Sequence, residues 1–232
     1  MKFVASQSSG KPVKVAFNTH WHPDHVGSNE ALGKAGAKII AHAYTKEWLS
    51  TEIDWGWQHK TFEPLPPAAL PNETFYDSGK MTFGKEAVEY AHLPQAHTDG
   101  DLYVYFPGPN ILMAGDVVSA GSYPVLDWTT NGWIRGMVNA QKTILQIAND
   151  NTKIIPGTGP AQTKAEVQAL SDMCNTVGER ILKMMKMGMG PKEIVAAKPT
   201  TDFDAKYGDP ELFLLNGYRG IWGHVRELGG IV

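Results

Sequence analysis

The sequence has a single cysteine, Cys174, among its 232 residues. One thiol cannot form an internal disulfide, and it excludes a metal site built from several cysteines. Cys174 falls in the apolar stripe of a long predicted helix, so we expect it to be a small buried hydrophobe. A chain with so little cysteine is compatible with either the cytoplasm or the periplasm.

Long apolar runs and excess positive charge are also absent. The apolar runs are too short to cross a bilayer, and the first twenty residues lack the continuous apolar segment of a signal peptide. The formal net charge of -3 provides no basic field for a phosphate backbone. We therefore expect a globular protein that binds neither membranes nor nucleic acid, and whose length suits one domain.

Several catalytic signatures are missing too. No Gly-x-Ser-x-Gly elbow occurs, which disfavours a serine hydrolase. The segment 156–162, PGTGPAQ, follows a predicted strand and opens a predicted helix, but it lacks the third glycine of a dinucleotide-binding loop. No cluster of lysine or arginine accompanies the histidine-rich segments, so nothing specifically favours a phosphorylated substrate.

The pattern of apolar residues predicts strands and helices mixed along the chain. Strands are predicted at 13–17, 37–41, 74–77, 80–83, 86–93, 102–106, 110–114 and 152–156, and the segments 102–106 and 110–114 form a hairpin. Helices are predicted after Ser28, from about Thr45 to Trp55, and over 163–186, where apolar residues recur every three or four positions. We expect a single domain over 1–232 with a helical C-terminal extension from about 163.

Histidine is the residue that stands out among those present. Residues 18–27 read NTHWHPDHVG. His20 and His22 are two residues apart, so both imidazoles point the same way if the preceding strand continues through them, and they can share one metal ion. Asp24 and His25 follow in a turn, where they can reach a second ion. Imidazole and carboxylate ligands suit zinc, with iron or manganese as alternatives.

Two further candidates lie downstream in similar settings. His97 is in the loop segment LPQAHTDGD, and Asp116 ends an apolar strand in ILMAGDVV. An uncompensated carboxylate at such a position is costly. A metal ion is the simplest partner for it.

The segments THWHPDH, AHTDGD and AGDVV occur in the order found in the metallo-β-lactamase superfamily of metal-dependent hydrolases, which the chain resembles from about residue 13 to 165. The resemblance implies an α+β fold, a four-layer αββα sandwich with the metal ions at one edge between the sheets. It also implies the ligands. His20, His22 and His97 would hold the first ion, Asp24 and His25 the second, and Asp116 would bridge the two.

Thr158 departs from the pattern of this family. The strand at 152–156 ordinarily leads into Pro-Gly-His-Gly, but this chain has Pro-Gly-Thr-Gly, and a threonine hydroxyl is a far weaker zinc ligand than an imidazole. A second ion would then have only Asp24, His25 and the shared Asp116 as protein ligands. Three alternatives remain: the second site is empty, it is weakly occupied, or water completes it.

The beginning of the chain is a second departure. Nineteen residues precede His20, where the family usually has several strands, so we expect N-terminal strands of the first sheet to be lacking. Their loss would expose an apolar face and an open strand edge, and both invite association. The sequence therefore predicts a homodimer or a swapped arrangement through residues 1–7, MKFVASQ. A truncated chain is the alternative explanation.

The motifs predict hydrolysis of a small-molecule substrate by a metal-activated water. A zinc ion lowers the pKa of its bound water to about 7, and Asp24 could orient that water and accept its proton. An ester, lactone, thioester, β-lactam, or a sulfate or phosphate ester would suit this chemistry, with activity weakened if one metal does the work of two. Aromatic residues that could line the pocket mouth are Trp55, Trp57, Tyr123, Trp128 and Trp133. The alternative is a degenerate metal-binding protein of the same fold with little or no turnover.

Overall fold

The computed structural model describes residue 6 and residues 9–230 of the chain. The swapped pairing predicted for residues 1–7 falls, apart from Ser6, outside the described residues. Within the described residues, no helix is both long enough and apolar enough to cross a membrane.

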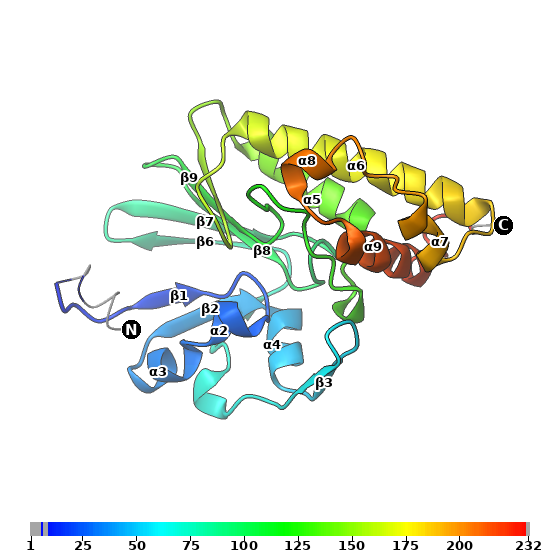
Figure 1. Cartoon of the computed structure of the whole chain (residues 1–232). Helices are drawn as coiled ribbons and strands as arrows, with labels where there is room; N and C mark the ends of the chain where they lie inside the picture. The colour runs from blue at the N-terminus through cyan, green and yellow to red at the C-terminus, as the bar shows by residue number, and fades with distance from the viewer. Residues whose placement is uncertain (1–5, 7–8, 231–232) are drawn as a thin grey trace.

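Two β-sheets lie face to face at the centre of the molecule (Figure 1). The smaller sheet is parallel and has the order β1-β2-β5, with β1 at Val15–Phe17, β2 at Lys38–His42 and β5 at Glu73–Phe75. The larger sheet has the order β10-β9-β8-β7-β6 and is antiparallel except where β10 joins β9. Its strands are β6 at Ser78–Phe83, β7 at Glu86–His92, β8 at Leu102–Phe106, β9 at Ile111–Gly115 and β10 at Lys153–Pro156.

Helices cover the outer side of each sheet (Figure 1). Beside the smaller sheet lie α2 at Pro23–Val26, α3 at Asn29–Lys34 and α4 at Ala43–Leu49. Beside the larger sheet lie α5 at Ile134–Ile147 and α6 at Lys164–Lys186, together with α7 at Pro191–Ala196, α8 at Asp204–Tyr207 and α9 at Glu211–Gly223. The elements form the predicted α+β sandwich of four layers, αββα.

Strand β2 is enclosed on both of its faces. Ile39 joins an apolar cluster with Leu32 of α3, whereas Ile40 joins the cluster between the sheets with Val88 and Leu102. Both isoleucines are fully buried. Apolar residues on both faces are typical of a parallel strand that is covered by helices on one side and by a second sheet on the other. This packing fixes β1, which pairs with β2, and so positions the histidine-rich loop that follows β1.

Helix α6 confirms the predicted apolar stripe. Its first turn is held by a capping box between Thr163 and Glu166. The stripe residues Val167, Leu170, Cys174, Val177 and Ile181 are all buried. Burial raises the pKa of the Cys174 thiol to about 12, so the prediction of a buried, hydrophobe-like cysteine is confirmed.

The predicted helix from Thr45 to Trp55 is wrong in its second half. Helix α4 ends at Leu49. The hydroxyls of Ser50 and Thr51 donate to backbone carbonyls in the last turn of the helix, and such local hydrogen bonds compete with helix continuation.

The segment after α4 forms a two-stranded antiparallel hairpin instead, with β3 at Ile53–Trp55 and β4 at Lys60–Phe62. We call residues 53–62 the tryptophan hairpin. The ring centroid of Trp55 lies 5.3 Å from that of Trp21 and 4.6 Å from that of Trp57. These contacts hold the hairpin beside the histidine-rich loop. Short 3₁₀ turns at Pro67–Ala69 and Trp128–Thr130 complete the described elements.

Candidate metal centre

The predicted ligands converge where β1 and β9 end. His20 and His22 lie in the loop after β1, and Asp116 follows β9 directly. The two loops approach closely because Gly115 has a φ of 55° and no side chain. A Cβ at Gly115 would lie 2.8 Å from Cβ of Thr19, so any other residue would push the loops apart.

His20, His22, His97 and Asp116 form one compact group, in which one ligand atom from each lies within 4.8 Å of every other. His97 Nε2 lies 2.9 Å from His22 Nδ1 and 3.7 Å from Asp116 Oδ2. His20 Nε2 lies 3.9 Å from the same carboxylate oxygen. Ligand atoms at tetrahedral corners around zinc are about 3.3–3.6 Å apart. The observed distances lie on either side of the spacing that one zinc ion requires.

The two closest nitrogens turn their lone pairs toward each other. His97 Nδ1 donates to the backbone carbonyl of Val125 at 2.8 Å, which leaves Nε2 without a proton in the neutral ring. His22 Nε2 donates to Asp127 Oδ2 at 3.0 Å, which likewise leaves Nδ1 without a proton. Two acceptors 2.9 Å apart repel each other unless a proton or a metal ion lies between them.

A proton on Nδ1 of His22 is disfavoured near neutral pH. Burial lowers the pKa of His22 to about 4, even though its hydrogen bond with Asp127 acts in the opposite direction. Burial, together with the neighbouring imidazoles, also lowers the pKa of His20 well below its usual range. His20 Nε2 is buried and has no hydrogen-bond partner among the described residues. Neutral imidazoles with free nitrogens are the form that binds metals, so these residues fit a metal ion.

Asp127 supports the group, although the motifs did not predict it. This fully buried carboxylate accepts hydrogen bonds from His22 Nε2 at 3.0 Å and from Thr130 Oγ1 at 2.7 Å through Oδ2. Its other oxygen, Oδ1, accepts a hydrogen bond from Trp57 Nε1 at 3.0 Å. The carboxylate of Asp127 therefore orients His22, a candidate metal ligand, and through Trp57 it holds the tryptophan hairpin beside His22.

Asp127 remains ionised despite its burial. Burial alone would raise its pKa, but the hydrogen bond and charge of His22 outweigh that effect and lower the pKa. In the sequence it is a single aspartate after an apolar stretch, a signal too common to identify it.

Asp101 is a second supporting residue that sequence reasoning missed. Its two carboxylate oxygens accept hydrogen bonds from the backbone N–H of Thr98 at 2.7 Å and from Thr98 Oγ1 at 3.0 Å. Burial raises the pKa of Asp101 to about 7. These bonds shape the turn that presents His97.

The residues predicted for a second ion are arranged differently. His25 Nε2 lies 3.2 Å from Asp116 Oδ1 and 3.6 Å from Asp24 Oδ2. Burial opposes protonation of His25, but the hydrogen bond and charge of Asp116 outweigh it and raise the pKa. The Asp24 side chain is 72% exposed, and Thr158 is exposed on the loop after β10. Among the described residues, Asp24, His25 and Asp116 do not form a second compact group.

A cleft of about 420 Å³ opens beside the compact group. His22, His97 and Asp116 line one part of it, and the tryptophan hairpin lines another with Trp55, Trp57, Lys60 and Phe62. Of the aromatic residues predicted for the pocket mouth, Trp55 and Trp57 thus reach the cleft, and Tyr123 lines an adjoining cavity with Asp116 and Thr158. Trp128 instead packs against Arg219, and Trp133 stacks on His224 in the helical region.

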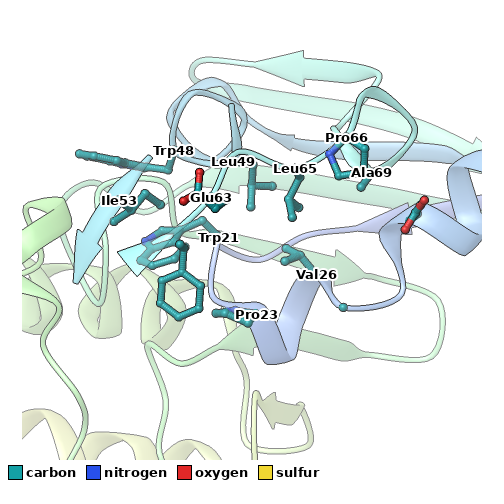
Figure 2. Close-up of a pocket in the computed structure, with 13 residues that line it drawn as sticks. Trp21, Pro23, Val26, Trp48, Leu49, Ile53, Glu63, Leu65, Pro66 and Ala69 are labelled. Atoms are coloured by element: carbon teal, nitrogen blue, oxygen red, sulfur yellow. The ribbon is translucent and has the colours of Figure 1, made fainter. Parts of the chain in front are cut away.

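A neighbouring cavity of about 200 Å³ has mainly apolar walls (Figure 2). Trp21, Leu49 and Leu65 line it, and Pro23 and Phe62 belong both to this cavity and to the cleft. Apolar surface therefore extends beyond the cleft on the side of the tryptophan hairpin.

The family model of the metallo-beta-lactamase superfamily matches residues 3–159 of this chain. The chain therefore belongs to this superfamily, whose members are generally hydrolytic metalloenzymes that typically use zinc.

Individual relatives are distant. The metallo-beta-lactamase type 2 of Elizabethkingia meningoseptica is 24% identical over 137 residues, which are 57% of this chain and 49% of the relative. The hydroxyacylglutathione hydrolase of Gloeobacter violaceus is 28% identical over 114 residues, which are 48% of this chain and 37% of the relative. The chain thus spans half or less of the length of these two curated relatives.

A solved structure confirms the fold. The stereoselective inverting sec-alkylsulfatase Pisa1 from Pseudomonas sp. has a TM-score of 0.72 to this structure, with 17% sequence identity. The similar region covers 96% of this chain and 43% of that protein. At this level of identity the similarity shows the fold alone.

Proposed function

We propose that this protein is a metal-dependent hydrolase whose metal ion is held by His20, His22 and His97 with the carboxylate of Asp116. The observation that best supports this proposal is the set of buried imidazole nitrogens of His20, His22 and His97 that converge beside Asp116, while the other nitrogens of His22 and His97 bond to Asp127 and Val125. Zinc suits this donor set, and iron or manganese would also fit it.

A bound zinc ion supplies Lewis acidity and lowers the pKa of a coordinated water to about 7. The chain's own residues have separate tasks. Asp127 keeps His22 in the tautomer that presents Nδ1 to the centre. Asp24, which lines the same cleft and is largely exposed, can orient an attacking water and accept its proton.

The cleft favours a substrate with an apolar group. Trp55, Trp57 and Phe62 present aromatic surface, and Lys60 is the single cationic side chain among the described lining residues. We propose an ester, lactone, thioester, β-lactam or sulfate ester as the bond that is cleaved.

A substrate panel tests the proposal. The metal-loaded protein would be assayed with a β-lactam, an acylglutathione, a lactone and a secondary alkyl sulfate, substrates suggested in part by the names of the similar proteins. We expect turnover of at least one substrate, lost to background in His22→Ala and Asp116→Ala. Lys80→Ala, which changes an exposed residue of β6, is the matched control and should keep the activity. Absence of turnover across the panel would contradict the proposal.

The degenerate metal-binding protein is the second candidate. The observation that favours it is Thr158, together with a His25 side chain that is hydrogen-bonded within the protein. Tight metal binding without hydrolysis of any panel substrate would support this candidate.

Homodimer formation is a further part of the proposal. Among the described strands, β1 pairs on one side only, with β2, so its other edge can accept a strand from a second copy. Light scattering coupled to size exclusion should give the mass of two chains. A monodisperse monomer over a broad concentration range would contradict this prediction.

A further inference from the structure

We infer that the cavity of about 200 Å³ beside the cleft binds an uncharged hydrocarbon chain of the substrate, so that the bond cleaved at the candidate metal centre carries an acyl or alkyl chain. We call it the apolar cavity. This inference rests on the proposed function for the position of the bond that is cleaved. Its test measures binding and not turnover, so the two can fail separately.

The apolar cavity adjoins the metal ligands both in sequence and in space. Trp21, which lines it, is the residue between His20 and His22. Pro23, which follows His22, and Phe62 of the tryptophan hairpin line both the apolar cavity and the cleft. The ring centroid of Phe62 lies 5.6 Å from that of Trp21. A chain attached to a group at the metal centre therefore reaches the apolar cavity past Pro23 and Phe62.

The walls of the apolar cavity present mainly hydrocarbon to a ligand. Figure 2 shows Trp21, Leu49 and Leu65 around it. The indole Nε1 of Trp21 donates to Thr130 Oγ1 at 3.1 Å, so the single polar atom of this side chain is already paired. A hydroxyl or a charged group placed against these walls would lose its hydrogen bonds to water, whereas a methylene chain gains from leaving water. The walls thus favour a hydrocarbon chain.

The wall on the side of the hairpin is preformed. The backbone N–H of Leu65 donates to the carbonyl of Leu49 at 2.9 Å, which joins the segment after β4 to the end of α4. Leu49 and Ile53, which also line the cavity, are buried at the two sides of the turn between α4 and β3. A preformed pocket binds a chain without the entropy cost of ordering its own walls.

The charges around the apolar cavity oppose an anionic chain end. Glu30 and Glu63 are the only charged side chains among the described residues that line it, and both are exposed. A carboxylate at the end of the chain would meet charges of the same sign, which disfavours its binding. Lys60 lines the cleft but does not line the apolar cavity, so it offers no counter-charge there. The end of the chain is therefore uncharged.

The size of the apolar cavity sets a lower limit on the chain. A dry apolar cavity of about 150 Å³ holds a benzene molecule, so this one, at about 200 Å³, has room for at least about six carbon atoms. We therefore expect a preference for chains that are long enough to pass the cleft and fill the cavity.

Alkyl hydroxamates test the inference, because the hydroxamate group binds zinc while the chain length is varied alone. Isothermal titration calorimetry would measure the affinity of zinc-loaded protein for acetohydroxamate and its butano-, hexano-, octano- and decano- homologues. We expect the affinity to rise about three- to fourfold for each methylene that enters the cavity, and to level off once the cavity is full. An affinity that does not depend on chain length would overturn the inference.

A charged chain end provides the complementary probe. The monohydroxamate of octanedioic acid has the chain length of octanohydroxamate but ends in a carboxylate. It should bind at least about tenfold more weakly than octanohydroxamate, because its charge would be desolvated near Glu30 and Glu63. Equal affinities would overturn the assignment of an uncharged chain end.

Variants at Leu65 locate the effect in the apolar cavity. In each variant the measured quantity is the ratio of the affinities for octanohydroxamate and acetohydroxamate, so a general loss of zinc or hydroxamate binding cancels. Leu65→Trp should fill the cavity and lower this ratio at least about tenfold. Leu212→Trp, which adds the same ring to an exposed position of α9, is the matched control and should keep the ratio.

Leu65→Ala acts in the opposite direction. It enlarges the cavity, so the affinity should level off only at a longer chain. A folded Leu65→Trp variant that keeps the ratio of the unmodified protein would overturn the inference. If Leu65→Trp does not fold, Leu65→Ala decides, and a level reached at the same chain length as in the unmodified protein would overturn it.

Metal-free protein gives a measurement that does not depend on zinc. Titration with 1-hexanol should shift the NMR signals of Trp21 and Leu65 to saturation, with little change at Leu212. Equal shifts at all three residues, or none, would overturn the inference.

The outcomes separate this inference from the proposed function. Binding that depends on chain length, without hydrolysis of any panel substrate, would overturn the proposed function alone. Hydrolysis that is lost in His22→Ala, together with affinities that do not depend on chain length, would overturn the inference alone.

Discussion

Two groups of clustered histidines in this molecule differ in the groups that their ring nitrogens contact. Away from the candidate metal centre, the rings of His42 and His92 stack with centroids 3.6 Å apart and planes 12° from parallel. His42 Nε2 donates to the carbonyl of Tyr76 at 2.8 Å, and His42 Nδ1 accepts from the backbone N–H of Tyr44 at 3.3 Å. His92 Nε2 likewise donates to the carbonyl of Asp99 at 2.7 Å, so three ring nitrogens of this pair bond to backbone groups.

The metal centre shows the opposite arrangement. Its outer nitrogens, His97 Nδ1 and His22 Nε2, bond to Val125 and Asp127. Its inner nitrogens, His97 Nε2 and His22 Nδ1, face each other. Clustering is common to both groups of histidines, so it does not by itself identify a metal site. The distinguishing feature is that no group among the described residues donates a hydrogen bond to the inner nitrogens, and a buried acceptor without a donor is costly unless a cation binds it.

Removing the metal ion should produce the largest change, a decrease in the free energy of unfolding. At a free zinc concentration about 1,000 times the Kd, binding should raise the free energy of unfolding by about 4 kcal/mol, and a chelator should remove this gain. His20→Asn should abolish the zinc dependence, whereas His42→Asn should retain it. Denaturant unfolding at fixed free zinc measures both. A zinc dependence lost equally in the two variants would contradict the contrast between the two histidine groups.

Asp127→Asn should have the next largest effect. The amide would hold His22 less firmly in the required tautomer, so zinc affinity should fall about 10–100-fold. Trp57→Phe is the matched control, because it removes a hydrogen bond to the other oxygen of Asp127 and leaves His22 bonded. Competition with a chromophoric chelator gives both affinities. Equal losses in the two variants would show that Asp127 acts through the hairpin and not through His22.

Thr19→Val should have a smaller effect on the same measurement. The substitution removes a neutral hydroxyl that lies 3.2 Å from Nδ1 of both His20 and His25, while keeping the shape of the side chain. A neutral hydrogen bond contributes about 1 kcal/mol, so zinc affinity should fall about fivefold. A loss as large as that of Asp127→Asn would mean that the hydroxyl has a further role at the site.

Protonation of the stacked pair, His42 and His92, should have the smallest effect, which is a change in the free energy of unfolding with pH. Burial, with His92 as the next cause, lowers the pKa of His42 from 6.5 to about 4, and burial also lowers the pKa of His92. The unfolded chain then binds protons that the folded chain does not, so the free energy of unfolding falls as the pH falls from about 6.5 toward 4.

Replacing one member of the pair tests this explanation. In metal-free protein, His92→Asn should make the decrease shallower over that pH range, because one titrating group is removed and the like-charge neighbour of His42 is lost. Denaturant unfolding at a series of pH values gives the slope. Identical slopes in the two proteins would assign the pH dependence to other groups.

Much of this protein could be predicted from its sequence. The spacing of His20 and His22 after a strand predicts that these two can share an ion, and the family resemblance adds His97, Asp116 and the αββα layers. The apolar stripe of α6 and the hairpin of β8 and β9 also followed from local pattern. These features depend on residues close together in the chain, where periodicity and motif spacing carry the information.

Other features were decided by tertiary contacts. The end of α4 and the start of β3 depend on hydroxyl groups and on the packing of Trp55 against Trp21, which helical periodicity does not reveal. Asp127 bonds to His22 across 105 positions of sequence, and His25 and Asp116 meet only because the β1 and β9 loops converge. The sequence by itself determined which side chains could bind a metal. The folded structure decided which of their nitrogens lack partners, because hydrogen-bond satisfaction depends on groups that packing brings together from distant parts of the chain.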